Sequence, residues 1–356
     1  MYRLLDLFSG CGGMTLGFSD PRFCGGFKSI FAIDNNPAAV DSYNLNFGDH
    51  AVCRNIEEWL LENCEIPKAD IVIGGPPCQG FSLLNKGREG DVRRSLWQPY
   101  MDIVEISEAS VFIIENVQGL LKSIEYESII KKADSLGFHV VASLLNAANY
   151  GVPQTRIRTL IIGWKKHLAA SIPYPPAPTN TQNPGDLTLP PWKTVRDAIG
   201  DLPIPQGTEI RNIEPPLNLH FGRSPTEKSI LRYKSVPPGG NRFDLQKNAP
   251  HLTPNCWIHK TKGGTDLFGR LWWDRPSVTI RTEFFKPEKG RYLHPDQHRP
   301  ITHREAARLM GFPDDFLFSG SKIDIARQIG NAVPPPLAGA VARYIRSLLD
   351  EWFHVE

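Results

Sequence analysis

Short apolar runs alternate with helix-like segments through the first half of this 356-residue chain, and this alternation restricts the fold more than any other feature. The expected strands are residues 4–8, 29–34, 52–56, 70–73, 111–115, 139–145 and 159–164. Helix-like stretches such as residues 37–47 and 122–136 lie between them, the second followed by Gly137 as a C-cap. Such a chain is expected to fold as an α/β protein, with a mostly parallel sheet that helices cover on both faces.

The chain changes character after the seventh expected strand. Residues 171–192 read SIPYPPAPTNTQNPGDLTLPPW, which is rich in proline and polar turn residues and is typical of a domain boundary. The region beyond it is dense in proline, glycine, tryptophan and basic residues and shows no clear helical period. We therefore expect a first domain at residues 1–178, a smaller loop- and strand-rich domain at residues 179–319, and a C-terminal segment at residues 320–356.

Helical order returns near the C-terminus. The stretch from Thr302 to Glu305 has the pattern of a capping box and predicts the start of a helix. Apolar residues then recur at helical spacing, at Leu337, Val341, Tyr344, Ile345, Leu348 and Trp352. The last helix is therefore expected to pack an apolar face against the rest of the protein.

Composition argues against several classes of protein. No window of eighteen or more apolar residues exists, so no membrane-spanning helix is expected, and the N-terminus lacks the layout of a signal peptide. The six cysteines form no CxxC pair, so neither a metal site nor a disulfide framework is indicated, and a reducing, cytoplasmic compartment fits. The formal charge of +2 does not by itself indicate a nucleic-acid partner.

One region is locally basic. Residues 211–291 hold about fifteen Lys and Arg against about seven Asp and Glu, an excess that suits a surface facing phosphates. A loop-rich, solvated subdomain would have the same composition, and charge alone does not separate these two interpretations.

The stretch DLFSGCGGMTLGF, residues 6–18, runs from an expected strand into Gly10, Gly12 and Gly13. Glycines at such a turn let the backbone approach a ligand closely, and an acid at the end of the next strand, here Asp34, suits two ribose hydroxyls. The pattern is neither GxGxxG nor a P-loop, so a nucleoside without a pyrophosphate fits best, and S-adenosylmethionine is the common one. A glycine-rich turn with no ligand is the alternative.

The stretch GGPPCQGFS, residues 74–82, places Cys78 directly after two prolines at the end of an expected strand. Prolines stiffen the turn, so the thiol would be presented as a nucleophile, although a buried structural cysteine is the commoner case. Glu115 ends another strand and would lie at the same edge of the sheet, unless it only caps the following helix. Arg156 and Arg158 would face the same side of a strand, which is also ordinary for a basic strand edge.

Together these motifs resemble those of the C5-cytosine DNA methyltransferases, over nearly the whole chain and in the same order. DLFSGCGG resembles the cofactor loop of that family, GGPPCQGFS its catalytic loop, ENV its glutamate motif and QTRIR its QxRxR motif. REAARLMGFPDDF and QIGNAVPPPLA resemble its two C-terminal motifs. The resemblance implies a Rossmann-like class I methyltransferase sheet in the first domain, a target-recognition domain in the second, and a final segment that returns to the catalytic domain.

The resemblance also implies a covalent mechanism. The Cys78 thiolate would attack C6 of a cytosine flipped out of the duplex, and Glu115 would contact N3 and the exocyclic amine. Arg158 would contact O2 with Arg156 in support, and the carbonyl of Pro76 would accept from the exocyclic amine. S-adenosylmethionine would be the methyl donor, held by Phe8, Gly10, Gly12, Asp34, Asn35, Asn55, Ile56, Pro76, Leu96, Asn331 and Val333.

One residue departs from the family pattern. The family usually has Asp-Ile after the third strand, and this chain has Asn55-Ile56. The carbonyl oxygen of an asparagine side chain can still accept the hydrogen bond of the adenine amine, so cofactor binding is expected to persist.

The resemblance implies double-stranded DNA as the substrate, a monomeric enzyme, and a restriction endonuclease as its functional partner in a prokaryotic restriction–modification system. Candidates for reading bases are Asn255, Trp257, His259, Lys260 and Lys262, by chemistry alone. The tRNA-methylating branch of the family, marked by Cys-Phe-Thr, is a rival, but that tripeptide is not found here. A non-catalytic DNA-binding homologue and a folate-dependent enzyme such as thymidylate synthase are the others. The recognised DNA sequence does not follow from the motifs.

Overall fold

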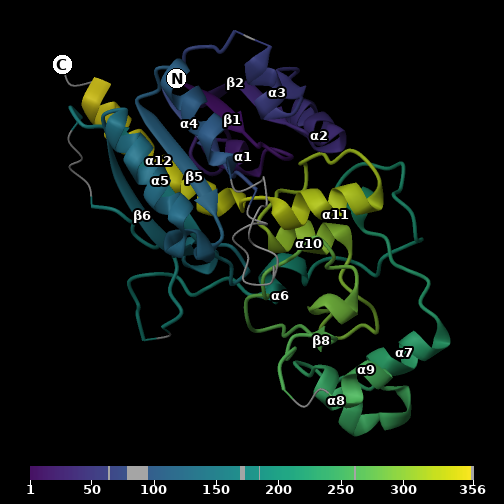
Figure 1. Cartoon of the computed structure of the whole chain (residues 1–356). Helices are drawn as coiled ribbons and strands as arrows, with labels where there is room; N and C mark the ends of the chain where they lie inside the picture. The colour runs from purple at the N-terminus through teal and green to yellow at the C-terminus, as the bar shows by residue number, and fades with distance from the viewer. Residues whose placement is uncertain (63–64, 78–94, 169–172, 184, 260–261, 354–356) are drawn as a thin grey trace. The chain divides into compact units, whose positions relative to one another are not determined.

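The structure, a computed structural model, describes residues 1–62, 65–77, 95–168, 173–183, 185–259 and 262–353. The chain divides into two compact units (Figure 1). Unit 1 consists of Met1–Gly151, Arg156–Thr179 and Ala332–Glu356, and unit 2 consists of Val152–Thr155 and Asn180–Asn331. Each unit is therefore assembled from segments that are separated in the sequence.

Unit 1 is built on a seven-stranded sheet with the order β3-β2-β1-β4-β5-β7-β6. Strands β1 to β5 pair in parallel, and β7 runs antiparallel between β5 and β6. The strand order reverses between β1 and β4, and ligands bind at such a switch point in open α/β sheets. The Rossmann-like α/β fold predicted from the sequence is confirmed. The strands are β1 (Tyr2–Leu7), β2 (Phe27–Asp34), β3 (Ala51–Cys53), β4 (Ile71–Gly74), β5 (Val111–Asn116), β6 (Phe138–Asn146) and β7 (Ile157–Lys165).

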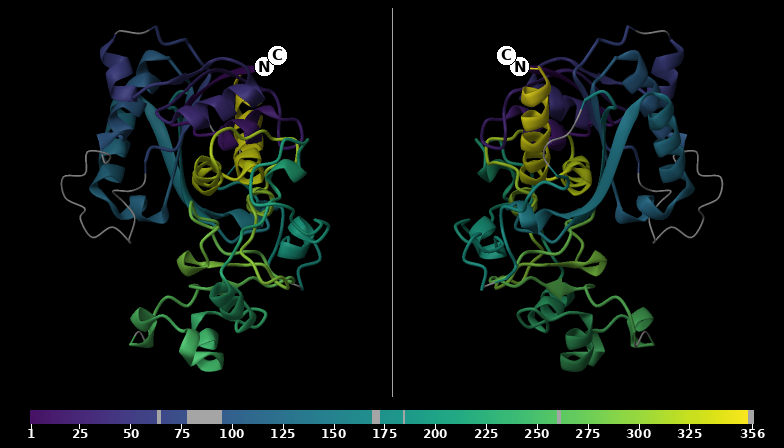
Figure 2. Two further views of the ribbon diagram at one scale, coloured as in Figure 1. Left: turned by 90° about the vertical axis from the view of Figure 1, so that its right-hand side faces the viewer. Right: turned by 90° about the vertical axis from the view of Figure 1, so that its left-hand side faces the viewer.

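Helices cover both faces of this sheet (Figures 1 and 2). Successive side chains of a strand point to opposite faces. On one face, Leu5 and Leu7 of β1 belong to a core cluster that also contains Trp59, Tyr100 and Ile129 from three helices. On the other face, β2 packs against the helix that follows it. The helices of unit 1 are α1 (Gly13–Ser19), α2 (Pro37–Phe47), α3 (Ile56–Leu61), α4 (Trp97–Ile106), α5 (Ile124–Ser135) and α12 (Pro335–Phe353), with 3-10 turns η2 (Gln118–Lys122) and η3 (Ala147–Tyr150).

The last helix, α12, packs closely against α1. A Cβ on Gly17 would lie 2.5 Å from Cβ of Ala338, so only glycine permits this approach. Leu337, Val341, Ile345 and Leu348 are fully buried, as the helical spacing predicted. Near the N-terminus, the Tyr2 hydroxyl donates to Oδ1 of Asp350 in α12 at 2.7 Å.

Local signals explain most element boundaries, and one expected strand is wrong in extent. Gly137 has a φ of 77° just after α5, which is the C-cap geometry expected of it. The expected strand at residues 52–56 ends at Cys53, because Asn55 adopts the N-cap position of α3. A short polar residue at that position satisfies helix N–H groups and stops the strand.

Unit 2 consists mainly of loops and short helices. The helices α7, α8 and α9 lie where the sequence showed no helical period, and among the described residues of this unit only β8 and β9 are strands, so strands are fewer than expected. Capping boxes at Asn241 and Thr302 begin α8 and α10. The elements are α6 (Val195–Ile199), α7 (Glu227–Lys234), α8 (Arg242–Asn248), α9 (Asn255–Ile258), β8 (Gly269–Arg270), β9 (Arg291–Leu293), α10 (His303–Leu309) and α11 (Lys322–Asn331), with 3-10 turns η4 (Leu217–Leu219), η5 (Pro250–Leu252) and η6 (Pro287–Lys289).

Candidate active site

The turn between β1 and α1 has an unusual backbone. Phe8, Gly10 and Gly12 have positive φ angles of 55°, 55° and 87°. This conformation is strained for Phe8, and strained residues of this kind cluster at ligand sites. A Cβ on Gly12 would lie 2.3 Å from the Phe47 ring, whereas one on Gly10 would meet no atom within 4 Å. The turn is therefore tightly packed at Gly12 and open at Gly10, which suits a backbone that a ligand approaches.

Asp34 lies beside this turn at the end of β2. Its Oδ2 accepts the N–H of Gly10 at 2.9 Å, and its Oδ1 accepts the N–H of Asn36 at 2.9 Å. Burial raises the pKa of Asp34, and the backbone hydrogen bonds from Asn36 and Gly10 oppose that rise. The structure therefore brings together Gly10 and Asp34, which the sequence paired, while the Asn35 side chain is exposed.

Ser9 is a candidate that the sequence analysis missed. Its Oγ is buried and makes no hydrogen bond with the residues that the structure describes. A buried hydroxyl without a partner costs about 1–3 kcal/mol, and a ligand at the turn would supply that partner. A serine beside glycines is common in turns, so the sequence alone does not single it out.

Apolar and capping residues border the same edge of the sheet. Phe8 and Leu96 are partly buried and pack against the core cluster that includes Ile56. Oδ1 of Asn55 accepts the N–H groups of Glu57 at 2.8 Å and Glu58 at 3.3 Å. That oxygen caps α3 here, and its predicted role toward an adenine amine stays a prediction.

Glu115 and Arg158 meet between β5 and β7. Glu115 Oε1 lies 3.0 Å from Arg158 Nε, and the two side chains are only 10% and 15% exposed. Because β7 is antiparallel to β5, the start of β7 lies at the same edge as the end of β5. Despite the ion pair, Oε1 accepts no hydrogen bond from the described residues, so an acceptor position remains. A Cβ on Gly75 would lie 3.2 Å from Glu115 Oε2, so a glycine there leaves room for the carboxylate.

Asn116 holds the start of the proline turn. Its Nδ2 donates to the Pro76 carbonyl at 3.0 Å, and its Oδ1 accepts the N–H of Val117 at 2.8 Å. Asn116 is 2% exposed, so this link between the ends of β4 and β5 is shielded from water. The predicted nucleophile Cys78 follows two residues after Pro76 and lies outside the described residues.

Arg156 occupies a different environment from Arg158. It is 2% exposed, and its Nη2 donates to the carbonyl of Ala332 at 3.1 Å. Arg156 therefore anchors the segment that leads through Val333, itself buried, to α12. Asn331, the other predicted residue of this segment, is the last residue of α11 in unit 2.

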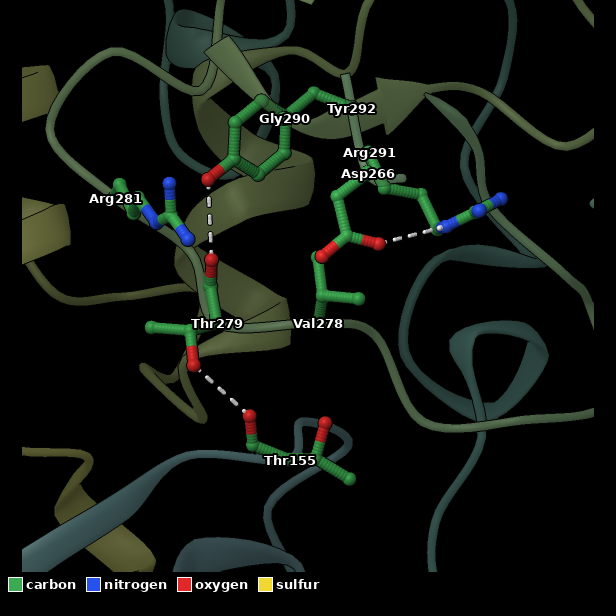
Figure 3. Close-up of a pocket in the computed structure, with 8 residues that line it drawn as sticks. All are labelled: Thr155, Asp266, Val278, Thr279, Arg281, Gly290, Arg291 and Tyr292. Atoms are coloured by element: carbon green, nitrogen blue, oxygen red, sulfur yellow. Dashed lines mark hydrogen bonds and ion pairs between the residues drawn. The ribbon is translucent and has the colours of Figure 1, made fainter. Parts of the chain in front are cut away.

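Unit 2 contains a polar cavity of about 230 Å³ (Figure 3). It is lined by Thr155, Asp266, Val278, Thr279, Arg281, Gly290, Arg291 and Tyr292. Arg291 Nε lies 3.4 Å from Asp266 Oδ1, so this pair is close to neutral. Arg281 is exposed and makes no ion pair or side-chain hydrogen bond with the described residues, so the cavity carries one available cation.

The basic character of residues 211–291 is partly internal. Arg270 is 2% exposed and donates to the carbonyls of Val236, His294, Gln297 and Tyr233. Arg242 and Arg291 are buried in the same way. These guanidinium groups stabilise the fold of unit 2 from inside. The number of exposed basic residues that could face phosphates is therefore smaller than the count from the sequence suggests.

The proposed base-reading residues separate into two groups. Asn255, His259 and Lys262 are exposed, and Lys260 lies outside the described residues. Trp257 is buried in the core cluster of unit 2, with its ring 5.8 Å from that of Phe268. Trp257 is therefore a core residue in this structure, and its ring is not exposed for contact with a base.

Two further classes of site are absent from the described residues. They contain no group of His, Cys, Asp and Glu that could hold a metal ion. None of their helices combines the length and the apolar character needed to cross a membrane.

Comparison with known proteins points to one family. The model of the C-5 cytosine-specific DNA methylase domain matches residues 2–347. The type II methyltransferase M1.HphI of Haemophilus parahaemolyticus is 34% identical over 352 residues, which cover 96% of this chain and 86% of that protein. The type II methyltransferase M.MthTI of Methanothermobacter thermautotrophicus is 31% identical over 360 residues, with 98% of both chains covered.

A solved structure agrees with these relatives. A protein from E. coli described as a prophage-encoded DNA modification methyltransferase superposes with a TM-score of 0.71 at 25% identity, covering 98% of this chain and 100% of that one. The Dnmt2 methyltransferase of S. pombe superposes with a TM-score of 0.61 at 20% identity, which shows the shared fold.

Proposed function

The chain belongs to the family of C-5 cytosine-specific DNA methylases and is a DNA cytosine-5 methyltransferase, and from this premise we propose how it acts. It transfers a methyl group from S-adenosylmethionine to C5 of a cytosine within a specific sequence of double-stranded DNA. One observation carries this proposal. The open turn at Gly10, the carboxylate of Asp34 and the Glu115–Arg158 pair all belong to one edge of the sheet in unit 1.

The residues at the turn fit S-adenosylmethionine, which supplies a methyl group on a sulfonium sulfur. Asp34 offers a carboxylate for the ribose hydroxyls, while Phe8 and Leu96 offer apolar surface for the adenine. The buried Ser9 hydroxyl, which has no partner among the described residues, would gain one from a ligand at this turn. The remaining predicted contacts are Gly12, Asn35, Asn55, Ile56, Pro76, Asn331 and Val333.

The chemistry at the base depends on Cys78, Glu115 and Arg158. The Cys78 thiolate forms a bond to C6 while Glu115 supplies a proton at N3, so that C5 becomes the nucleophilic carbon of an enamine. With S-adenosylmethionine bound, C5 would take its methyl group and S-adenosylhomocysteine would leave. A base would then remove the C5 proton, the cysteine sulfur would leave C6, and N3 would return its proton to Glu115. Glu115 Oε1 has its acceptor position free for the exocyclic amine, and Arg158 is held beside it to contact O2.

Two backbone contacts support this arrangement. Asn116 Nδ2 donates to the Pro76 carbonyl, and a carbonyl oxygen can accept a second hydrogen bond, here from the exocyclic amine. Arg156 acts at a distance from the base by fixing the backbone of Ala332. The carbonyl of Pro76 is thereby held against the end of β5, and Cys78 is two residues further along the sequence.

The DNA substrate and the biological setting follow from the same proposal. A thiolate cannot reach C6 of a stacked base, so the cytosine is flipped out of the duplex. Unit 2 recognises the DNA, and its exposed residues Arg281, Asn255, His259 and Lys262 are candidate contacts. The similar proteins are named type II methyltransferases, which supports a role beside a paired restriction endonuclease in protecting host DNA. We propose that the enzyme acts as a monomer.

A trapping experiment tests the covalent step. Substrate DNA with 5-fluorocytosine at the target position should form a stable adduct with the wild-type enzyme, because fluorine at C5 cannot leave as a proton. The adduct should require the methyl donor and should vanish in Cys78→Ser, which keeps the shape but has a hydroxyl of far higher pKa. Methylation at C5 by an enzyme that never forms the adduct would contradict the mechanism. Bisulfite sequencing of DNA from expressing cells identifies the site.

A further inference from the structure

Tyr43 is fully buried in α2 and joins three elements of unit 1. Its hydroxyl lies 2.9 Å from Oγ1 of Thr15 in α1 and 2.7 Å from Oγ of Ser29 in β2. The ring is 0% exposed. Neither the sequence motifs nor the proposed mechanism uses this residue.

Thr15 closes the glycine turn. Its Oγ1 donates to Oδ2 of Asp6 at 2.6 Å. Asp6 lies on β1 before the turn and Thr15 lies on α1 after it, so this single hydrogen bond joins the two ends of the turn. The geometry of the turn at Gly10 therefore depends on where the Thr15 hydroxyl is held.

The Tyr43 ring also supports the turn directly. A Cβ on Gly12 would lie 2.9 Å from Cδ2 of Tyr43 and 2.3 Å from Cε2 of Phe47. The aromatic rings therefore occupy the space beside Gly12, and the backbone of the turn rests against them. Tyr43 contacts the turn through its ring and through its hydroxyl.

The direction of this chain of hydroxyl groups follows from the charge of Asp6. Each hydroxyl has a single proton. When Asp6 is ionised, the Thr15 hydroxyl donates its hydrogen bond to Asp6, so Tyr43 donates to Thr15 and Ser29 donates to Tyr43. Nε2 of His50 lies 2.8 Å from Ser29 Oγ and is then the donor, so with ionised Asp6 we expect the Nε2–H tautomer of His50.

Asp6 gives this alignment a physical reason. Burial raises the pKa of Asp6 to about 7, the hydrogen bond from Thr15 lowers it, and the charge of Asp34 raises it. A buried carboxylate near a second carboxylate needs donors that point toward it. The chain of aligned hydroxyls supplies them at the base of the cofactor turn.

We propose that Tyr43 is a positioning residue for the cofactor, which fixes the turn at Gly10–Gly13 relative to Asp34 through the chain His50–Ser29–Tyr43–Thr15–Asp6. Ser29 lies on β2, the strand that ends at Asp34. The hydrogen-bond chain therefore links the glycine turn to the strand that carries Asp34. The inference rests on the proposed binding of S-adenosylmethionine at this turn.

Calorimetry with S-adenosylmethionine tests the inference on Tyr43→Phe, which keeps the ring and removes the hydroxyl. The matched control is Tyr100→Phe. Tyr100 is equally buried, and its hydroxyl lies 3.0 Å from the Val72 carbonyl and 2.7 Å from the Ile113 carbonyl. Tyr100 is not part of the hydrogen-bond chain through Tyr43. The Kd for the cofactor should rise about tenfold in Tyr43→Phe and stay within about twofold of wild type in Tyr100→Phe. The KM for the cofactor should rise in Tyr43→Phe while kcat at saturating cofactor is retained.

Each outcome bears on a different claim. If the wild-type protein fails to bind S-adenosylmethionine, the proposed function fails. If the wild-type binds and the two tyrosine variants are equally affected or both unaffected, the positioning role is refuted. Thr15→Val interrupts the same hydrogen-bond chain at the neighbouring hydroxyl. It should reproduce the rise in Kd, and it replaces Tyr43→Phe as the test if that variant does not fold.

Nitrogen-15 NMR of the wild-type protein above pH 8 should show His50 as the Nε2–H tautomer, and the Nδ1–H tautomer would contradict the direction of the hydrogen-bond chain.

Discussion

The carboxylate of Glu115 lies 3.0 Å from the guanidinium of Arg158, although the two residues are 43 positions apart in the sequence. The antiparallel strand β7 makes this possible, because it brings its first residues to the edge where β5 ends. An acid and a fixed cation side by side match the N3, amine and O2 edge of a cytosine.

Removal of the acid tests this match. Glu115→Gln keeps the size of the side chain but cannot supply the proton at N3, so single-turnover methyl transfer should fall by about 10²–10⁴-fold. Binding of S-adenosylmethionine should be unchanged. Glu105→Gln, which alters an exposed acid paired with Lys132, is the control and should retain the wild-type rate. A Glu115→Gln enzyme that transfers methyl groups at the rate of this control would exclude Glu115 from the chemical step.

Asp34 should control cofactor affinity and its pH dependence. Loss of a hydrogen bond to a charged group in Asp34→Ala should weaken S-adenosylmethionine binding by about 1.5–3 kcal/mol in calorimetry. Because burial raises the pKa of Asp34, its carboxylate is protonated at a higher pH than an ordinary aspartate. Wild-type affinity should therefore fall as the pH falls toward the raised pKa of Asp34, and the variant should lose the part of that dependence due to Asp34. Identical affinity in both proteins would mean that the ribose lies elsewhere.

The raised pKa of Asp34 has the opposite effect on the stability of the free enzyme: acid favours folding, whereas it weakens cofactor binding. A folded pKa above the unfolded value means that the contribution of Asp34 to stability is greatest at low pH and is lost as the pH rises through the folded pKa. Without cofactor, Asp34→Asn should therefore gain stability relative to wild type as the pH rises, measured by urea unfolding. A gain that appears only at acidic pH would contradict this assignment.

Arg281 should contact the DNA backbone. For each phosphate contact, the slope of log K against log salt changes by about 0.9, so Arg281→Ala should reduce the steepness of the wild-type slope by roughly that amount. Lys132→Ala removes the same charge from α5 in unit 1, where Lys132 is paired with Glu105, and should leave the slope unchanged. Binding titrations over a range of salt concentrations measure both. Equal slopes in the wild type and Arg281→Ala would remove the cavity from the DNA-binding surface.

Glu305 should stabilise unit 2 in a pH-dependent way. Burial would raise its pKa, but hydrogen bonds and charge from Arg299, with His294 and the Thr302 N–H, lower it on balance. Its Oε1 lies 2.6 Å from Arg299 Nη2, and its side chain is 1% exposed. Glu305→Gln leaves Arg299 without its anion and should cost about 3–5 kcal/mol at pH 7.

The direction of the Glu305 pKa shift determines how the loss of stability in Glu305→Gln depends on pH. A folded pKa below the unfolded value gives stability that is present above about 4.3, the ordinary value for glutamate, and that is lost as the pH falls through the folded pKa. The difference between wild type and Glu305→Gln in urea unfolding should therefore shrink as the pH falls below about 4. A difference that grows on acidification would contradict the ion pair.

Local signals in the sequence predicted much of the fold and part of the site. Alternating apolar runs predicted the sheet, and the glycines at residues 10 to 13 with Asp34 predicted a turn that the structure places beside that acid. The helices α7 to α9 were missed because each spans eight residues or fewer, too short for a helical period, although the capping box at Asn241 was a usable signal.

Other features depend on contacts between distant residues and have no local pattern. Three such features appear only when several strands and helices are assembled: the Ser9 hydroxyl without a partner among the described residues, the hydrogen bond from Asn116 to Pro76, and the hydrogen-bond chain through Tyr43. Arg270 is a residue whose role the sequence pattern misassigned. Its charge counts toward a basic surface in the sequence, but four carbonyl groups surround it in the fold.

The placement of α12 has a consequence for biosynthesis. This helix packs on α1 in unit 1, yet its residues follow all of unit 2 in the chain. A ribosome therefore releases the whole of unit 2 before unit 1 has its last helix, and domains tend to fold as they emerge. The unit that we propose recognises DNA should therefore be complete in the nascent chain before the unit that we propose performs the methyl transfer.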